Sequence, residues 1–285
     1  MKTPLGAAML GLALAASIVL AQTKPEPPRG DARKPAPPAS SNATAQLLPE
    51  IAKAFHTNVK LSATTTHLVV QSDGIPKHPT GTFPNRDNPN RIQTQNYSFK
   101  IPLQPKRADS PGKLPFGPIG VAINGIPFYN PYNSQGRDAV MGPDAEIFDS
   151  CCGHPDQLGR YHYHKYPACV KSPFKDDGTG HSPVIGFAFD GFALYGLNGE
   201  NGKPPADLDE CNGHSDKTRG YHYHATEKFP YLIGAYRGSI DMSNFSGGPN
   251  PFGKGDSGKG PPPKGKGPPP KGKGPPPKGK GPPKP

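Results

Sequence analysis

Histidine and tyrosine gather in two short segments that share one pattern. The first segment has His154 followed by Tyr161-His162-Tyr163-His164, and the second repeats it sixty residues later with His214 and Tyr221-His222-Tyr223-His224. Six of the ten histidines in the 285-residue chain lie in these two segments. Imidazole nitrogens are common ligands of zinc and copper, so this concentration predicts metal binding.

The alternation of tyrosine and histidine predicts a β-strand on which both histidines share one face. Their Cα atoms are then about 6.6 Å apart, and their rings can converge on one ion at metal–nitrogen distances of about 2.0 to 2.1 Å. Glycine and aspartate between the two parts of each segment predict a hairpin turn. A turn centred near Leu158 places His154 opposite His162. The predicted metal ligands are His154, His162, His164, His214, His222 and His224.

Other residues near the two segments are candidates for supporting roles. Asp156 and Asp216 are expected to accept the outer N–H of a ligating imidazole and so to orient it. His78 and His181 are candidates for additional ligands. Imidazole with a nearby carboxylate suits Cu(II) or Zn(II), and the sequence does not separate the two. In the alternative interpretation, the histidines and tyrosines form a purely structural hydrogen-bond network.

Several phrases around the two segments resemble the YHYH domain family of exported proteins. They are Ser72-Asp-Gly-Ile-Pro-Lys-His78, Ile119-Gly-Val-Ala-Ile-Asn-Gly-Ile-Pro-Phe128, His181-Ser-Pro-Val-Ile-Gly-Phe-Ala-Phe-Asp-Gly-Phe-Ala-Leu-Tyr-Gly196 and Leu208-Asp-Glu-Cys-Asn-Gly-His214. Together with the paired motifs they extend the resemblance over roughly residues 55–245. The family is named for its motif, and the resemblance implies no particular activity.

The rest of the chain divides by composition into four parts. Residues 1–21 have the apolar run and small-residue end of a secretory signal peptide, so the protein is expected to be secreted or periplasmic. No second apolar segment is long enough to span a bilayer, so no transmembrane segment is expected in the mature protein. Residues 22–45 predict a proline-rich linker, 46–250 the folded domain, and 251–285 a disordered Gly/Pro/Lys repeat tail.

The folded part is expected to be mainly β and loop-rich, stabilised by disulfides and flanked by disordered tails. Strands are predicted at 67–71, 97–101, 119–123 and 184–189, with one short helix at 47–55. A strand followed by Asn124-Gly125 precedes the first histidine segment, and a strand followed by Asp190-Gly191 precedes the second. This similarity predicts two internal copies of a strand-plus-hairpin module, at about 119–170 and 184–238. The two histidine clusters either share one site or form two.

Four cysteines in an exported chain predict two disulfides. A bridge between the adjacent Cys151 and Cys152 would be strained. Cys169 is therefore expected to pair with one of them and Cys211 with the other, which would tie the two modules together. Cysteine thiolates acting as metal ligands are the competing interpretation, and an oxidising compartment disfavours them.

The basic charge is concentrated in the tail. Residues 251–285 hold nine lysines and one aspartate, a net of +8 within a whole-chain charge of +11. This tail is expected to bind an acidic surface polymer or an anionic membrane surface, and specific nucleic-acid binding is not expected.

Three classes of function fit these features. The main hypothesis is an exported copper- or zinc-binding protein for storage or delivery. The alternatives are a secreted metalloenzyme with an open three-histidine site, or an extracellular scaffold whose His/Tyr motifs are structural. The sequence has no nucleophile motif, phosphate-binding loop or paired-carboxylate signature to indicate another chemistry.

Overall fold

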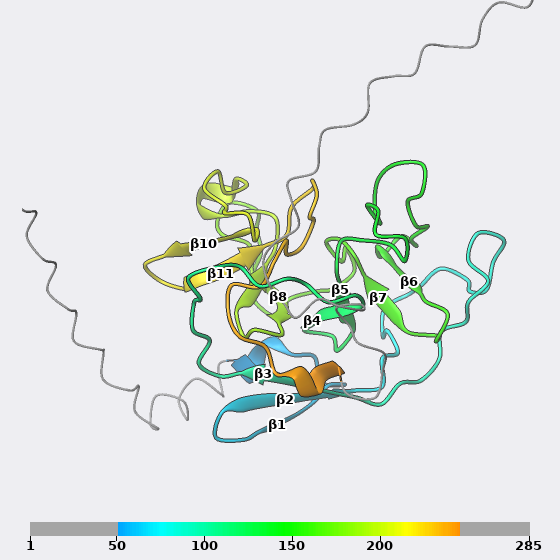
Figure 1. Ribbon diagram of the computed structural model, residues 1–285, viewed down its shortest axis with the longest axis horizontal. Coiled ribbons are helices and arrows are strands. Elements are labelled where there is room, and N and C mark those ends of the chain that lie inside the picture. Colours follow the sequence, from blue (N-terminus) through cyan, green and yellow to red (C-terminus); the bar gives the residue numbers. More distant parts are fainter. Residues whose placement is uncertain (1–50, 246–285) are drawn as a thin grey trace, which may run out of the picture. The chain divides into compact units, whose positions relative to one another are not determined.

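Residues 51–245 are described by a computed structural model, in which strands and long loops dominate (Figure 1). This confirms the expected mainly β, loop-rich fold. The predicted signal peptide, linker and lysine-rich tail lie outside the described residues. The strands are β1 (Lys60–Ala63), β2 (His67–Ser72), β3 (Tyr97–Pro102), β4 (Pro118–Ala122), β5 (Pro127–Tyr129), β6 (Gly153–Pro155), β7 (Tyr161–Tyr163), β8 (Val184–Ala188), β9 (Ala193–Tyr195), β10 (Gly213–Asp216) and β11 (Gly220–His224).

Helical structure is sparse in the described range. Residues 51–54 are helical, within the predicted helix at 47–55. Two short 3₁₀ turns, η1 (Glu200–Gly202) and η2 (Met242–Phe245), follow later. No helix within residues 51–245 has the length and apolar character that crossing a membrane requires.

The three strands β1, β2 and β3 form a small antiparallel sheet in that order. In β2 the alternation of Leu68, Val70 and Ser72 with more exposed residues buries one face of the strand, as period-two patterning predicts. Val70 lies opposite Phe99 of β3, and both are buried. This sheet therefore offers one apolar face to the rest of the domain.

The other eight strands form one sheet, in the order β10-β11-β9-β8-β4-β5-β7-β6. The antiparallel pair β4 and β8 lies at its centre, with Gly120 opposite Ala188 and Ala122 opposite Gly186. A Cβ atom on Gly120 would lie only 2.6 Å from the carbonyl oxygen of Phe187, so a glycine is required there. On each side of this pair, a short strand is followed by a hairpin at the edge of the sheet. The two histidine hairpins therefore lie at opposite ends of the sheet (Figure 1).

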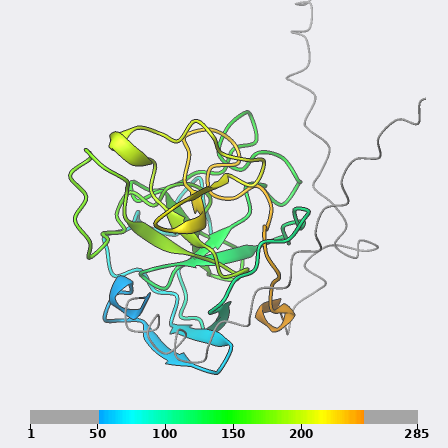
Figure 2. The ribbon, with the colours of Figure 1, turned by 90° about the vertical axis from the view of Figure 1, so that its left-hand side faces the viewer.

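The core lies between the small sheet and the large one. The rings of Phe99 in β3 and Phe189 after β8 are 5.0 Å apart, and Phe55 stacks on Phe187 at 5.6 Å. All four side chains are buried. In Figure 2 the blue strands of the small sheet lie beneath the green and yellow strands of the large one. The continuous valine- and isoleucine-rich runs of β4 and β8 follow from their central position, since both faces of these strands are covered.

The cysteine prediction is half right. Cys151 and Cys169 form a disulfide, as expected for Cys169 and one of the adjacent pair. The second predicted bridge is wrong, because Cys152 and Cys211 are free thiols. Cys152 precedes β6 at one end of the large sheet and Cys211 precedes β10 at the other, so no bond can join them.

Candidate metal centres

Each histidine segment folds as an antiparallel hairpin at one end of the large sheet. In the first, β6 pairs with β7 so that His154 lies directly opposite His162. In the second, β10 pairs with β11 and His214 lies opposite His222. Both pairings are the ones that the turn prediction requires. The different position of glycine in the two turns leaves the register of the histidines unchanged.

The tyrosines of both motifs point to the opposite face and anchor the hairpins. Tyr161 donates its hydroxyl hydrogen bond to Asp149, and Tyr221 donates to Asp209. Tyr163 and Tyr223 are completely buried, and Tyr223 donates to the buried carboxylate of Asp190. The packing of these rings fixes the strands, so the histidine face of each hairpin has little freedom to rotate.

The first candidate centre, here called the first cluster, consists of Glu146, His154, His162 and His164. Their potential ligand atoms all lie within 4.8 Å of one another. The Nε2 atoms of His162 and His164 are 3.0 Å apart. Oε2 of Glu146 lies 3.0 Å from Nε2 of His154 and 3.1 Å from Nε2 of His164. These separations are short enough for the four atoms to bind one ion.

Two of these buried atoms form no hydrogen bond with the described residues. Oε2 of Glu146 and Nε2 of His154 are close in space, yet neither takes part in a hydrogen bond of acceptable geometry. Buried polar atoms are almost always satisfied, and an exception calls for an explanation. A metal ion between them would satisfy both.

The charge state of the first cluster also suits a cation. Burial lowers the pKa of His162 well below its ordinary value of 6.5, so this imidazole is neutral. Burial raises the pKa of Glu146, but the close imidazoles of His154 and His164 outweigh it and bring the pKa to about 2. The cluster therefore offers a carboxylate and at least one neutral imidazole at physiological pH.

The second candidate centre, here called the second cluster, consists of His181, His214, His222 and His224. Nε2 of His222 lies 3.2 Å from Nε2 of His181 and 3.1 Å from Nε2 of His214. Two ligands of a tetrahedral ion at bond lengths of 2.0 to 2.1 Å are about 3.3 to 3.4 Å apart. These separations therefore suit two nitrogens bound to one ion.

Every imidazole of the second cluster is held from outside through its Nδ1 atom. The acceptors are the carbonyl oxygens of Ser182, Gly220 and Gly196 for His181, His222 and His224, and the carboxylate of Asp207 for His214, at 2.8 to 2.9 Å. A neutral imidazole that donates from Nδ1 carries its lone pair on Nε2. Four lone pairs therefore point inward. Nε2 of His224 is buried and forms no hydrogen bond within residues 51–245.

Burial favours the neutral form of three of these imidazoles. It lowers the pKa of His181 and of His222, and it lowers the pKa of His224 to about 3. Protonation of these rings is unfavourable, so the cation that fits this arrangement is a metal ion.

The predicted roles of Asp156 and Asp216 are wrong. Asp156 accepts from the backbone N–H groups of Leu158 and Arg160 and pairs with the Arg160 side chain. Asp216 does the same for its own turn and pairs with Arg219. Its carboxylate comes no closer than 3.9 Å to the Nε2 atom of His222. Both aspartates stabilise hairpin turns, and backbone carbonyls take the orienting role, as at Nδ1 of His162 and His164.

Three contributors were missed or undervalued by the sequence pattern. Glu146 lies in an irregular loop and has no neighbouring motif, so only the fold could reveal it. His181 was a candidate for an additional ligand, and the structure places it in the second cluster. Asp207 holds His214 from a loop seven residues upstream, a spacing that matches no regular element.

The other candidate, His78, joins a different group. Its Nε2 atom bonds to the hydroxyl of Tyr163 at 2.6 Å, next to Cys151 and Cys169. The disulfide uses both sulfur atoms, so thiolate ligation is not possible here. His78 supports the packing of the first hairpin.

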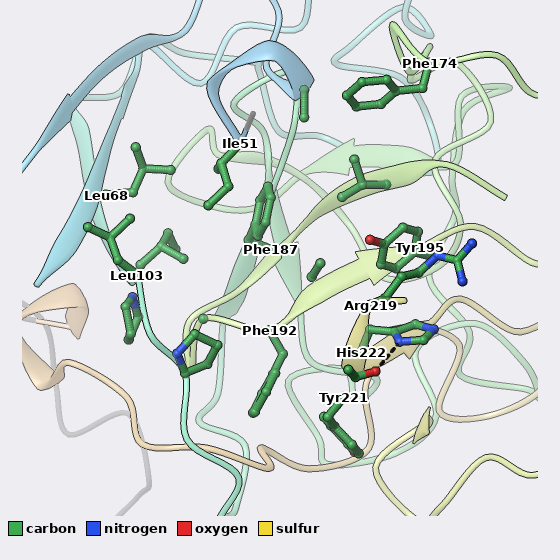
Figure 3. A pocket seen from close by; sticks show the side chains of 18 residues that line it. Ile51, Leu68, Leu103, Phe174, Phe187, Phe192, Tyr195, Arg219, Tyr221 and His222 are labelled. Carbon is green, nitrogen blue, oxygen red and sulfur yellow. Dashed lines mark hydrogen bonds between the residues drawn. The ribbon is translucent and has the colours of Figure 1, made fainter. Parts of the chain in front are cut away.

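The two clusters differ in how many of their residues line a cavity. All four residues of the first cluster line a cavity of about 660 Å³. Of the second cluster, only His222 lines a separate, largely apolar cavity of about 530 Å³. Figure 3 shows His222 with Tyr195 and Arg219 at one side of this second cavity, away from Leu68 and Leu103. The dashed line there marks the bond from Nδ1 of His222 to Gly220, so the nitrogen on that side is already used.

Comparison with protein families supports the family that the motifs resemble. Residues 98–204 match the family model described as "YHYH protein". The matched segment contains the first cluster and His181 and ends before the second hairpin. No curated protein and no solved structure matches this chain.

Proposed function

We propose that this chain, whose residues 98–204 belong to the YHYH family, is an exported metal-binding protein with two separate centres. The first cluster holds one divalent transition-metal ion through three imidazoles and a carboxylate, and the second holds another through four imidazoles. Storage or delivery of copper or zinc is the function that these ligand sets fit best.

The observation that carries the proposal is the orientation of the second cluster. Four Nε2 atoms converge, and each imidazole donates its N–H outward to an oxygen atom. In a purely structural network, one ring would donate to the next. With all four rings neutral, the inward atoms have lone pairs only, and an ion would supply the missing positive charge. The outer hydrogen bonds are also the ones that fix the tautomer and direction of metal-bound histidines.

The similar topology of the two halves supports an origin by internal duplication. Each half has a central strand, a short strand and an edge hairpin, in mirrored order across the β4–β8 pair. The clusters have diverged, because the first adds a carboxylate from the loop at Glu146 and the second adds the imidazole of His181. Two centres with different ligands suit two different tasks.

A metalloenzyme is the second candidate, and it applies to the first cluster alone. The cavity of about 660 Å³ reaches all four of its residues, so a small molecule can approach an ion held there. An ion with an open position acts as a Lewis acid toward such a molecule.

Export is supported by the disulfide between Cys151 and Cys169, since such bonds persist in oxidising compartments. The lysine-rich tail would then hold the protein on an acidic polymer or anionic membrane surface. This attraction is screened beyond about 8 Å at physiological ionic strength. Deletion of residues 251–285 should abolish salt-sensitive retention on an anionic matrix, and unchanged retention would contradict this role.

Metal analysis of the full chain tests the main proposal. Protein purified without a chelating tag is stripped with a chelator, incubated with Zn(II) or Cu(II), desalted and analysed for bound metal. We expect about two equivalents per chain. His162→Ala and His222→Ala should each lose about one, whereas His56→Ala, outside both clusters, should keep both. Folded protein that retains no stoichiometric metal would overturn the proposal.

A further inference from the structure

The cavity over the first cluster is large enough for a small organic molecule. Its volume of about 660 Å³ lies within the usual range for ligand sites, roughly 300 to 1,000 Å³. Its floor is formed by the four residues of the first cluster. The first cluster supplies four ligand atoms, so an ion there that takes five or six ligands keeps a position for an atom of a bound molecule. A ligand in this cavity can therefore reach an ion on the floor.

Three exposed apolar side chains lie among the residues that line the cavity. Phe116, Ile147 and Leu158 line it and are each more than half exposed, which is unusual for large apolar side chains. Tyr129 and Tyr132 add two aromatic rings to the lining. Tyr129 stacks on His162 with ring centroids 3.8 Å apart, so the aromatic lining is continuous with the first cluster. Exposed apolar side chains gathered around a polar floor indicate a binding site.

Several polar side chains of the lining are already engaged. Asn88, Asn130 and Asn133 each donate to a backbone carbonyl and accept from a backbone N–H. The Arg160 guanidinium pairs with Asp156. The walls therefore offer apolar contact more than hydrogen bonds, and polar recognition is left to the floor.

Resting on the proposed function, we propose that the first cluster binds a small aromatic molecule with two adjacent hydroxyl groups, a catechol-type ligand. Its oxygens coordinate the ion after their protons pass to solvent, and its ring packs against the aromatic and aliphatic walls. The ligand class follows from the combination of residues that can coordinate a metal, aromatic and aliphatic lining residues, and engaged asparagine amides. The second cluster is not expected to take such a ligand, because of its four residues only His222 lines the cavity of about 530 Å³, and its Nδ1 atom there is already bonded to the carbonyl of Gly220.

The test uses 4-nitrocatechol, whose visible absorption changes on coordination, with the full chain loaded with Zn(II). We expect saturable binding of about one equivalent per chain and no binding after the metal is removed. Phe116→Ser and Leu158→Ser should each weaken binding on the order of fivefold with bound zinc unchanged, because they remove apolar wall area. Both side chains are exposed, so folding should not suffer. Phe174→Ser, in the cavity beside His222, is the matched control and should have no effect.

The outcomes separate this inference from the proposed function. Zinc-loaded chain that retains two ions but binds no 4-nitrocatechol would overturn the inference and leave metal binding intact. Binding that the two wall variants do not weaken would also overturn it, since the probe would then coordinate zinc without using the cavity. Chain that retains no zinc would overturn the proposed function and the inference together.

Discussion

The Nε2 atoms of His214 and His222 lie 3.1 Å apart, although each ring already donates its Nδ1 hydrogen to an oxygen. With both rings neutral, two lone pairs face each other across a cross-strand pair. This arrangement is unfavourable without a positive charge between the rings. A change of tautomer in either ring would break its outer hydrogen bond. The contact from His214 to Asp207 is the one outer bond in the second cluster made by a side chain, so it can be tested by substitution.

Replacing Asp207 with asparagine should weaken metal binding at the second cluster. Nδ1 of His214 donates to a carboxylate oxygen at 2.8 Å, and an amide oxygen is a weaker acceptor. Loss of such an orienting partner costs about 10- to 100-fold in metal affinity. The exposure of Asp207 favours the lower end of that range. Competition with a chromophoric chelator measures the change in affinity.

The matched control for this variant is Asp177→Asn. Asp177 is an exposed carboxylate that pairs with Lys175 and accepts hydrogen bonds from Thr179, and neither partner belongs to a cluster. Its replacement should leave both metal affinities unchanged. Equal affinities for the Asp207→Asn variant and the parent chain would show that the carboxylate does not orient His214.

The metal-free protein should lose stability as the pH falls from 7 to 5. Burial lowers the pKa of His162, of His222 and, to about 3, of His224, whereas these groups titrate near 6.5 in the unfolded chain. Below pH 6.5 the unfolded state therefore binds more protons, and the free energy of unfolding decreases by an amount on the order of a few kcal/mol. Urea denaturation in the presence of a chelator, at both pH values, measures it.

Asp190 has the opposite effect on the pH dependence of the free energy of unfolding. Its burial raises the pKa to about 6, against the hydrogen bonds from Tyr223 and three backbone N–H groups. A raised carboxyl pKa contributes stability at low pH that is lost as the pH rises through 6. Asp190→Asn should thus make the loss between pH 7 and 5 steeper, and His224→Gln should make it shallower. A free energy of unfolding that is higher at pH 5 than at pH 7 in the parent chain would contradict the predicted sign.

The sequence pattern identified the hairpins because local residues determine them. Alternating Tyr and His, with turn residues between, is sufficient to predict that His154 and His162 face each other. The outer hydrogen bonds could not be predicted in this way, because carbonyls such as those of Asn130 and Gly196 reach the rings from distant strands and loops. Short-range pattern assigned the orienting role to Asp156, whose carboxylate instead caps its own turn.

The cysteines show the same limit at longer range. An oxidising compartment and the number of cysteines predict that disulfides form, but which cysteines pair depends on which strands are neighbours. The sequence did not predict whether the two hairpins lie close together or apart. In the structure they lie at opposite ends of the sheet, and this separation rules out the bridge to Cys211. The fold was predictable as a class, whereas the order of its strands was not.

The two free thiols should differ sharply in reactivity. Cys211 is buried, and burial raises the pKa of its thiol to about 12, so almost no thiolate is present at pH 8. Cys152 is partly exposed. Brief treatment of the native protein with iodoacetamide at pH 8 should modify Cys152 alone, and Cys211 only after unfolding. Mass spectrometry of the peptides gives the assignment.

A Cys152→Ser variant controls for this result, since it should show no modification in the native state. A peptide containing Cys152 joined to Cys211 in an unreduced digest would disprove the separation of the two hairpins. Reduction before unfolding should release two further thiols, those of Cys151 and Cys169.

The glycine before each leading histidine should be intolerant of any side chain. A Cβ atom on Gly153 would collide with the Tyr161 ring, and one on Gly213 would collide with the Tyr221 hydroxyl. Each ring is fixed by its bond to Asp149 or Asp209 and cannot move away freely. We expect Gly153→Ala to lower the free energy of unfolding by about 1 to 3 kcal/mol, as overpacking does. Because the ring holds the hairpin, the substitution should also weaken metal binding at the first cluster while leaving the second unchanged.

Gly180→Ala is the control, since a Cβ there meets no atom within 4 Å. Denaturation and metal titration of both variants check this expectation, and a Gly153→Ala protein as stable as Gly180→Ala would show that the tyrosine does not fix the hairpin.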